Sequence, residues 1–321
     1  MNGGIFVQTH SNKKILLDPR KVTGSDFIFV SHAHTDHLHK KKKNEKIKIK
    51  TLASKETSII AKIRGYDIQN TIDTYEGFEL VDTGHILGSR GLLIYDEIFY
   101  TGDISVRKRG FMNSTTNIPK VDTLIIESTF GKPEYVFPSI SKVIDQTNKI
   151  ISECYDKGNP VLIMGYSVGK AQLLFDLFKH WDPFYVHDSI YAINKIYSEL
   201  GIILKNSINH TFAEENNLLS KNNPWIMLSP LMNGNSKFVK HMKEKYGVVT
   251  IGFSGWSIQP GYKYMMNLDH TMTLSDHCDY NELIHVVKRS NAKKVYTIHG
   301  FADEFADSLR KMGFNAESLE K

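Results

Sequence analysis

The first 130 residues contain short apolar runs that are separated by turn-forming and charged residues. Such runs are typical of buried strands when Gly, Pro, Asn or Asp bounds them. The pattern predicts strands at 5–7, 15–17, 27–30, 78–81, 92–95, 98–100 and 124–126. It also predicts one helix among them, which Ser54 caps and Gly65 ends.

From residue 139 the pattern changes to helices that alternate with strands. Apolar residues recur at roughly helical spacing over 140–151, after a potential N-cap at Ser139. Further elements are expected as strands at 161–164, 184–186, 225–228, 248–251 and 295–298 and a helix at 170–180. This alternation predicts an α/β fold in which a small domain, 132–256, is inserted into a domain formed by 1–131 and 257–321. We expect the site between the two, as is common for pockets at domain boundaries.

Three histidines and an aspartate follow the predicted strand 27–30 within one short loop. Side chains two apart at a strand end point the same way, so His32 and His34 should face one point. Asp36 and His37 lie past the bend and should face a neighbouring point. Imidazole and carboxylate groups are the ligands that zinc and similar cations take, so the loop predicts a metal site.

Other candidate ligands also lie at strand ends. His85 lies in a glycine-flanked turn, and Asp103 follows the predicted strand 98–100. Asp18 ends the strand 15–17, where it could orient a ligand histidine through a hydrogen bond. A single strand-end Asp is more often a turn former, but several candidates in this order favour a metal centre.

These motifs resemble the metallo-β-lactamase superfamily, whose signature His-x-His-x-Asp-His precedes a later His and a later Asp. Three later segments resemble the motifs of the β-CASP nucleases, with Glu127, His277 and His299 as their polar residues. The stretches 131–133 and 253–256 look most like a compact subfamily of RNA 3′-end-processing-like and ligase-associated exonucleases. The resemblance covers nearly the whole chain and implies an αββα sandwich with an inserted α/β β-CASP domain.

The resemblance also implies roles for individual residues and two bound zinc ions, with manganese as the alternative. His32, His34 and His85 would hold the first ion, Asp36, His37 and His299 the second, and Asp103 would bridge them. Asp36, Asp103, Glu127 and His277 would be the catalytic set. Histidine is a natural proton donor near neutral pH, and a neighbouring carboxylate favours its charged form. We therefore expect His277, oriented by Glu127, to protonate the leaving 3′-oxygen.

The implied activity is hydrolysis of phosphodiester bonds in single-stranded DNA or RNA, in nucleic-acid processing or repair. The alternatives are a metallo-hydrolase of a small ester, thioester or lactone, and a binding subunit without activity. The set of Glu127, His277, His299 and the inserted domain favours the nuclease, because small-molecule members lack it. The filled ligand positions argue against a lost activity. Association with a DNA ligase or a helicase is a further implication, and the oligomeric state is open.

Two turns could contact substrate phosphate. Ser167 and Ser254 each lie where a predicted strand ends and a helix begins, and the free N–H groups of a helix start bind anions. A pocket for a terminal phosphate there would make the enzyme a 5′ exonuclease, whereas an open groove would allow internal cleavage. The other interpretation is an ordinary strand–helix turn. The run Lys40–Lys43 is a solvated loop or an extension of a basic track for nucleic acid.

Composition adds few constraints. The net charge of +5 over 321 residues fits a polyanionic substrate, although a general preference for Lys explains it equally well. Two cysteines exclude a disulfide framework and predict a reducing cytoplasm, with Cys278 interpreted as a packing residue. No apolar run is long enough for a membrane span, and the N-terminus lacks the apolar core of a signal peptide, so we expect no membrane association.

Overall fold

The computed structural model describes residues 4–10, 12–22, 24–39, 49–115, 117–221 and 223–319. The chain divides into two compact units. Unit 1 comprises Met1–Lys108, Met112–Val136 and His277–Lys321, and unit 2 comprises Arg109–Phe111 and Phe137–Asp276. The long segment of unit 2 ends at Asp276, later than the predicted domain 132–256, because its sheet continues into the strand at His270–Met272.

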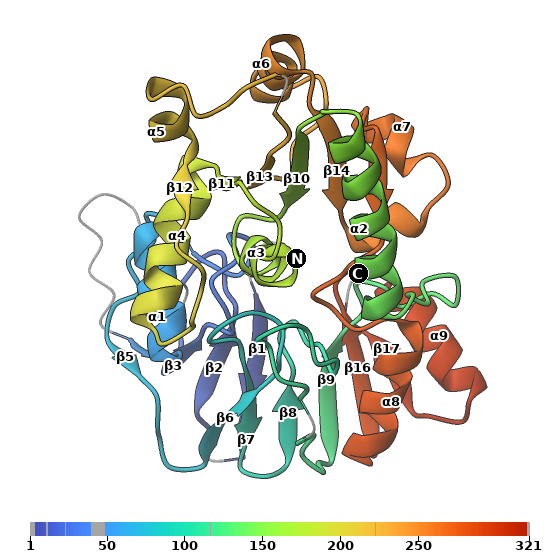
Figure 1. Ribbon diagram of the computed structural model, residues 1–321. Helices are drawn as coiled ribbons and strands as arrows, with labels where there is room; N and C mark the ends of the chain where they lie inside the picture. Colours follow the sequence, from blue (N-terminus) through green and yellow to red (C-terminus); the bar gives the residue numbers. More distant parts are fainter. Residues whose placement is uncertain are drawn as a thin grey trace. The chain divides into compact units, whose positions relative to one another are not determined.

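Unit 1 contains two sheets (Figure 1). The first has the order β1 (Ile5–Gln8), β2 (Lys14–Leu17), β3 (Phe27–Phe29), β4 (Lys50–Leu52) and β5 (Thr71–Ile72). The second has the order β17 (Ala316–Ser318), β16 (Lys294–Ile298), β9 (Thr123–Glu127), β8 (Ile98–Tyr100), β7 (Arg90–Ile94) and β6 (Phe78–Asp82). Strands β2 to β5 are mutually parallel, as are β8, β9, β16 and β17. The loops after β2, β3, β6, β8 and β16 carry the predicted ligands and Asp18.

The two sheets of unit 1 share one apolar layer, in which Leu17 and Phe29 of the first sheet join Tyr100 and Ile125 of the second. Side chains of a strand alternate between its two faces. Leu124, next to Ile125, therefore belongs to a separate apolar cluster on the other face of the second sheet. Helices α8 (Tyr280–Ser290) and α9 (Ala302–Lys311) complete that cluster. The expected α/β sandwich is confirmed.

Helix α1 (Lys55–Ile63) begins where the sequence predicts. The Thr57 N–H donates to the Ser54 hydroxyl oxygen over 3.0 Å, which satisfies one of the unpaired donors of the first turn. Gly65 follows the helix with a φ of 84°, the left-handed conformation that glycine adopts without strain.

Unit 2 is a parallel sheet of six strands with helices between them. The strand order is β12 (Ile208–Asn209), β11 (Phe184–Val186), β13 (Ile226–Pro230), β10 (Val161–Gly165), β14 (Val249–Phe253) and β15 (His270–Met272). The helices are α2 (Ile140–Asp156), α3 (Lys170–Phe178), α4 (Asp188–Glu199), α5 (His210–Glu215), α6 (Lys237–Tyr246), the 3-10 turn η1 (Gly255–Ile258) and α7 (Tyr262–Met266).

The central strand β10 is buried on both faces, as parallel sheets require. Val161 and Ile163 join one apolar cluster of unit 2, and Leu162 and Met164 join the other. This explains why its sequence is an unbroken apolar run rather than an alternating one. No helix in the described ranges is both long and apolar enough to cross a lipid bilayer.

Candidate metal centre

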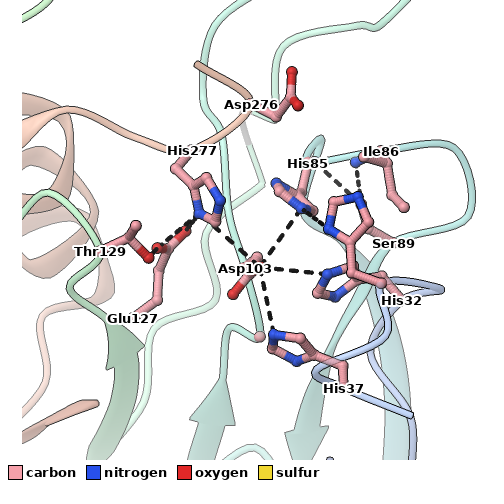
Figure 2. Close-up of polar contacts among 12 residues, drawn as sticks. His32, His37, His85, Ile86, Ser89, Asp103, Glu127, Thr129, Asp276 and His277 are labelled. Atoms are coloured by element: carbon pink, nitrogen blue, oxygen red, sulfur yellow. Dashed lines mark hydrogen bonds and ion pairs between the residues drawn. The ribbon is translucent and has the colours of Figure 1, made fainter. Parts of the chain in front are cut away.

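Asp103 lies at the centre of a group of histidines from separate loops of unit 1 (Figure 2). Its Oδ2 atom is 3.3 Å from Nε2 of His32, 3.5 Å from Nε2 of His37 and 3.5 Å from Nε2 of His85. The loop after β3 supplies His32 and His37, the β6–β7 turn supplies His85, and the end of β8 supplies Asp103. Loops at one edge of the two sheets thus bring the predicted ligands together.

One set of four residues has the spacing of a closed metal site. Ligand atoms of His32, His34, His85 and Asp103 all lie within 4.8 Å of one another, and Nε2 of His85 is 3.1 Å from Nδ1 of His34. Neighbouring ligands of a tetrahedral zinc ion are roughly 3.3 Å apart when each lies about 2.0–2.1 Å from the metal. Nε2 of His32 is buried and has no hydrogen-bond partner in the described part of the chain. An imidazole nitrogen placed in this way fits a metal ligand.

The predicted second set is more open. Nε2 of His37 is 3.8 Å from Oδ2 of Asp36, whose side chain is 62% exposed. The ring of His299 lies 5.5 Å from that of His37, measured between centroids. Of the second set, His37 lies beside the carboxylate that the first set surrounds, and the Asp36 side chain is open to solvent, as in a catalytic site with open positions.

Asp18 fixes the ring of His37, in the orienting position that the sequence predicts. Its Oδ2 lies 2.9 Å from Nδ1 of His37 and accepts hydrogen bonds from the hydroxyls of Ser31 (2.6 Å) and Tyr100 (2.7 Å). Its Oδ1 accepts the Ser31 N–H over 2.7 Å. With Nδ1 held, Nε2 of His37 faces Asp103. Sequence analysis missed Ser31 and Tyr100, although both stand directly beside motif residues.

Two residues of the site have left-handed backbones. The φ angle is 43° at Asp18 and 60° at His299, a region uncommon for residues with a side chain. The Ser128 hydroxyl donates to the His299 carbonyl over 2.7 Å and so supports this conformation. Backbone strain of this kind concentrates at functional sites, where the surrounding structure maintains it.

A hydrogen-bonded His–Glu pair lies beside the metal ligands. Nδ1 of His277 is 2.9 Å from Oε2 of Glu127, and 4.0 Å from Oδ2 of Asp103 (Figure 2). Glu127 is fully buried and also accepts the Ile104 N–H (2.8 Å) and the Thr129 hydroxyl (2.5 Å). Sequence analysis did not anticipate Thr129. Asp103, Glu127 and His277 are themselves close enough to hold a cation, but the His–Glu hydrogen bond is satisfied without one.

Charges within the site shift several pKa values. Burial, aided by the neighbouring imidazoles, lowers the pKa of His32 well below its usual value. Burial alone would also lower the pKa of His37, but Asp103 and Asp18 outweigh it and raise that pKa to about 10. Burial would raise the pKa of Glu127, but His277 and the hydrogen bonds to the carboxylate lower it. Burial raises the pKa of Asp103. A cation would favour the ionised form of Asp103 and the neutral imidazoles.

The predicted phosphate contacts lie in unit 2, not among these residues. Ser167 lies in the turn between β10 and α3, where Gly169 donates its N–H to Oε1 of Gln172 over 2.8 Å. Ser254 is fully buried, and its hydroxyl oxygen accepts the Trp256 N–H over 3.2 Å. These are the contacts of ordinary strand–helix turns, so contact with phosphate stays a prediction. The Lys40–Lys43 run lies outside the described residues. Cys278 is fully buried in the apolar cluster beneath α8, as expected of a packing residue.

Comparison with known proteins agrees with this geometry. A family model described as "Zn-dependent metallo-hydrolase RNA specificity domain" matches residues 261–318. The chain is 33% identical to the "Probable DNA ligase" of Opitutus terrae over 91% of its own length but 28% of that protein. It is 25% identical to the "RNase J-like protein" of Methanocaldococcus jannaschii, over 86% of this chain and 81% of the relative. It is 26% identical to "Transcription termination factor FttA" of the same organism, over 77% of this chain and 49% of that protein.

A solved structure from Enterococcus faecalis V583, described as a protein of unknown function, has the same fold. The TM-score is 0.61 at 14% identity, and the match covers 92% of this chain and 79% of the other. The two sheets of unit 1, the histidine–aspartate cluster and these relatives agree with one another. The chain belongs to the β-CASP family of the metallo-β-lactamase superfamily, a group of zinc-dependent metallo-hydrolases.

Proposed function

We propose that this protein is a metal-dependent nuclease that hydrolyses phosphodiester bonds of single-stranded nucleic acid. The observation that carries this proposal is the His277–Glu127 pair, with Nδ1 of His277 only 4.0 Å from Asp103. An alkoxide leaving group needs a proton, and this pair provides a donor beside the metal ligands. Residues 261–318, matched by the RNA specificity domain, include both His277 and His299, which further supports a nucleic-acid substrate.

Two zinc ions would be held by His32, His34 and His85 for one and by Asp36, His37 and His299 for the other, with Asp103 shared. The clustering of the first set around Asp103 and the 3.5 Å between Asp103 and His37 support this assignment. When bound, such ions stabilise the negative charge that develops in phosphodiester hydrolysis and activate the attacking water. Manganese is the alternative, because imidazole and carboxylate ligands also suit it.

The residues of the chain divide the remaining work. Asp103 and the histidines of the two sets would hold the metal ions next to the phosphate. Asp18 keeps His37 in one orientation. Glu127 accepts the Nδ1–H of His277, so the proton on Nε2 is the one available for transfer to the leaving 3′-oxygen. The product strand would then carry a 5′-phosphate, and its former neighbour a 3′-hydroxyl.

We further propose action from a 5′ end, in the cytoplasm and in functional association with a DNA ligase. The helix start after Gly165 supports a site for a terminal phosphate. The two buried, reduced cysteines support a cytoplasmic location. The "Probable DNA ligase" of O. terrae carries a segment similar to this chain within a much longer protein, which supports the partnership. The RNA specificity match favours RNA, and the ligase relative favours DNA.

Cleavage of end-labelled single strands tests the proposal. DNA and RNA strands of one sequence, linear and circular, would be incubated with the zinc- or manganese-loaded protein and with Asp103→Asn as the control. We expect release of 5′-terminal mononucleotides from linear strands, dependent on the 5′-phosphate and absent in the variant. Efficient cutting of circles would contradict the 5′-exonuclease mode but support the nuclease. Cleavage of no strand by fully metallated protein would contradict the nuclease itself.

A further inference from the structure

One short segment of unit 1 carries the metal-site carboxylate Asp103 and contacts the residues around the proton donor His277. The segment is Asp103–Arg107, which follows β8. The Ile104 N–H donates to Oε1 of Glu127 over 2.8 Å, and the Ile104 carbonyl accepts the N–H of Cys278 over 2.8 Å. Ile104 therefore binds both Glu127, the partner of His277, and Cys278, the residue after His277.

Arg107, at the other end of the segment, forms hydrogen bonds to the start of the helix that follows His277. Nη2 of Arg107 donates to Oδ2 of Asp279 over 2.7 Å, and its Nε donates to Oε1 of Glu282 over 2.5 Å. The Arg107 side chain is only 17% exposed, so water screens these contacts little. A guanidinium that donates to two carboxylates fixes their positions relative to each other and favours their ionised forms.

Asp279 and Glu282 also form the capping box of α8. Oδ1 of Asp279 accepts the Glu282 N–H over 2.9 Å, and Oε2 of Glu282 accepts the Asp279 N–H over 2.9 Å. Each carboxylate thus uses one oxygen for the helix and the other for Arg107. The cap is complete without Arg107, so the arginine adds a connection from the start of α8 to the Asp103 segment.

We propose that Arg107 is a positioning residue for His277, a role that rests on the proposed nuclease function. His277 lies two residues before Asp279, and its proton must reach an oxygen whose place is set by the ligands around Asp103. Because Arg107 and Ile104 join these two parts, they hold the donor at a fixed distance from the bond that breaks. Misplacement by about 1 Å costs on the order of 10²-fold in rate.

A purely structural role is the competing explanation, and leaving-group chemistry separates the two. Thymidine 5′-(p-nitrophenyl phosphate) offers the same phosphate with a nitrophenolate that leaves without a proton. A misplaced proton donor therefore slows cleavage of a single strand but not of this ester. Loss of folding or of metal slows both.

The test uses two changes that leave the cap intact. Arg107→Met removes the fork, and the double variant Asp279→Ser/Glu282→Gln keeps capping side chains while removing both charges that Arg107 holds. Arg310→Met is the control, because Arg310 also pairs with an aspartate on a helix of unit 1, Asp307, far along the chain from His277. Metal content and amide hydrogen exchange over 278–284 would be measured in all proteins.

We expect kcat on the single strand to fall about tenfold or more in both test variants. The KM, the metal content and the rate on the nitrophenyl ester should stay within twofold of wild type, and exchange at the start of α8 should increase. Arg310→Met should change none of these. Equal losses on both substrates, or no loss on the strand, would overturn the positioning role alone. Inactivity of the wild type on both substrates would instead overturn the proposed function and the inference with it.

Discussion

A carboxylate orients each of two histidines in this site. Asp18 holds Nδ1 of His37 so that Nε2 faces Asp103, and Glu127 holds Nδ1 of His277. The two histidines resemble each other in this respect, but only His37 contacts Asp103 closely (3.5 Å). These contacts support our proposal of His37 as a metal ligand and His277 as the proton donor.

Asp18→Asn should weaken metal binding without unfolding the protein. The amide keeps the shape of the carboxylate but lacks its charge and one acceptor oxygen, so His37 is no longer held in one tautomer. Loss of such a supporting group costs about 10–100-fold in metal affinity. Competition with a chromogenic chelator measures this, with Asp26→Asn as the control, since the exposed Asp26 carboxylate accepts the Lys14 N–H. An affinity unchanged by Asp18→Asn would contradict the orienting role.

His277→Ala and His299→Ala should differ in metal content. We expect close to two equivalents of metal in the wild type and in His277→Ala, because His277 is held by Glu127 and not by the ligand set. His299→Ala should retain less than the wild type, and Asp103→Asn less still, since Asp103 contacts both sets. Elemental analysis of protein purified without chelator gives the answer. Full metal content in His299→Ala would show that His299 is not a ligand.

At the scale of elements, buried charged residues lie next to helix starts and strand ends. In unit 2, buried Asp276 forms ion pairs with Arg109 (3.0 Å) and with Lys170 at the start of α3 (3.1 Å). Lys170 also donates to the Leu274 carbonyl over 2.9 Å. Burial lowers the pKa of Lys170, and Asp276 opposes that shift. Each of these charges is tolerated only because the others neutralise it.

Asp276→Asn should therefore destabilise unit 2 strongly. The change removes the carboxylate with which the buried Arg109 and Lys170 pair, and breaking a buried pair in this way costs about 3–5 kcal/mol. Asp176→Asn is the matched control, because Asp176 pairs with the half-exposed Lys179, where about 0–1 kcal/mol is typical. Urea denaturation followed by circular dichroism compares the two. Similar free energies of unfolding for both variants would contradict a stabilising buried network.

The pair of helices α5 and α6 should make stability depend on acid pH. Burial would raise the pKa of Glu214, but Lys245, Tyr246 and His241 lower it to about 2. The depressed pKa means that Glu214 stabilises the fold above its usual pKa of 4.5, and that this contribution is lost as the pH falls towards 2. Glu214→Gln should thus be less stable than wild type at pH 7, with the difference vanishing at low pH. A difference independent of pH would contradict this assignment.

For the whole molecule, the sequence predicts which polar side chains come together better than it predicts the complete set of elements. Apolar runs indicate the strands of the core because burial demands them, whereas β4 and β5 are short and partly polar and were not predicted. Helix α8 has a capping box at Asp279 and Glu282 that the sequence shows. The helix was not predicted, because its first residues overlap the motif that contains His277. The metal ligands follow from strand ends, while the contacts of Ser31, Tyr100 and Arg107 depend on pairings between distant segments that no local pattern encodes.

The most direct test of His277 as the proton donor compares two substrates in one variant. The quantity is the ratio of kcat/KM on a single strand to kcat/KM on thymidine 5′-(p-nitrophenyl phosphate), measured for zinc-loaded wild type and His277→Ala. We predict that the ratio falls by about 10²–10⁴ in His277→Ala, because only the strand needs a proton on its leaving oxygen. An unchanged ratio in an active, fully metallated variant would contradict His277 as the proton donor and with it the proposed mechanism.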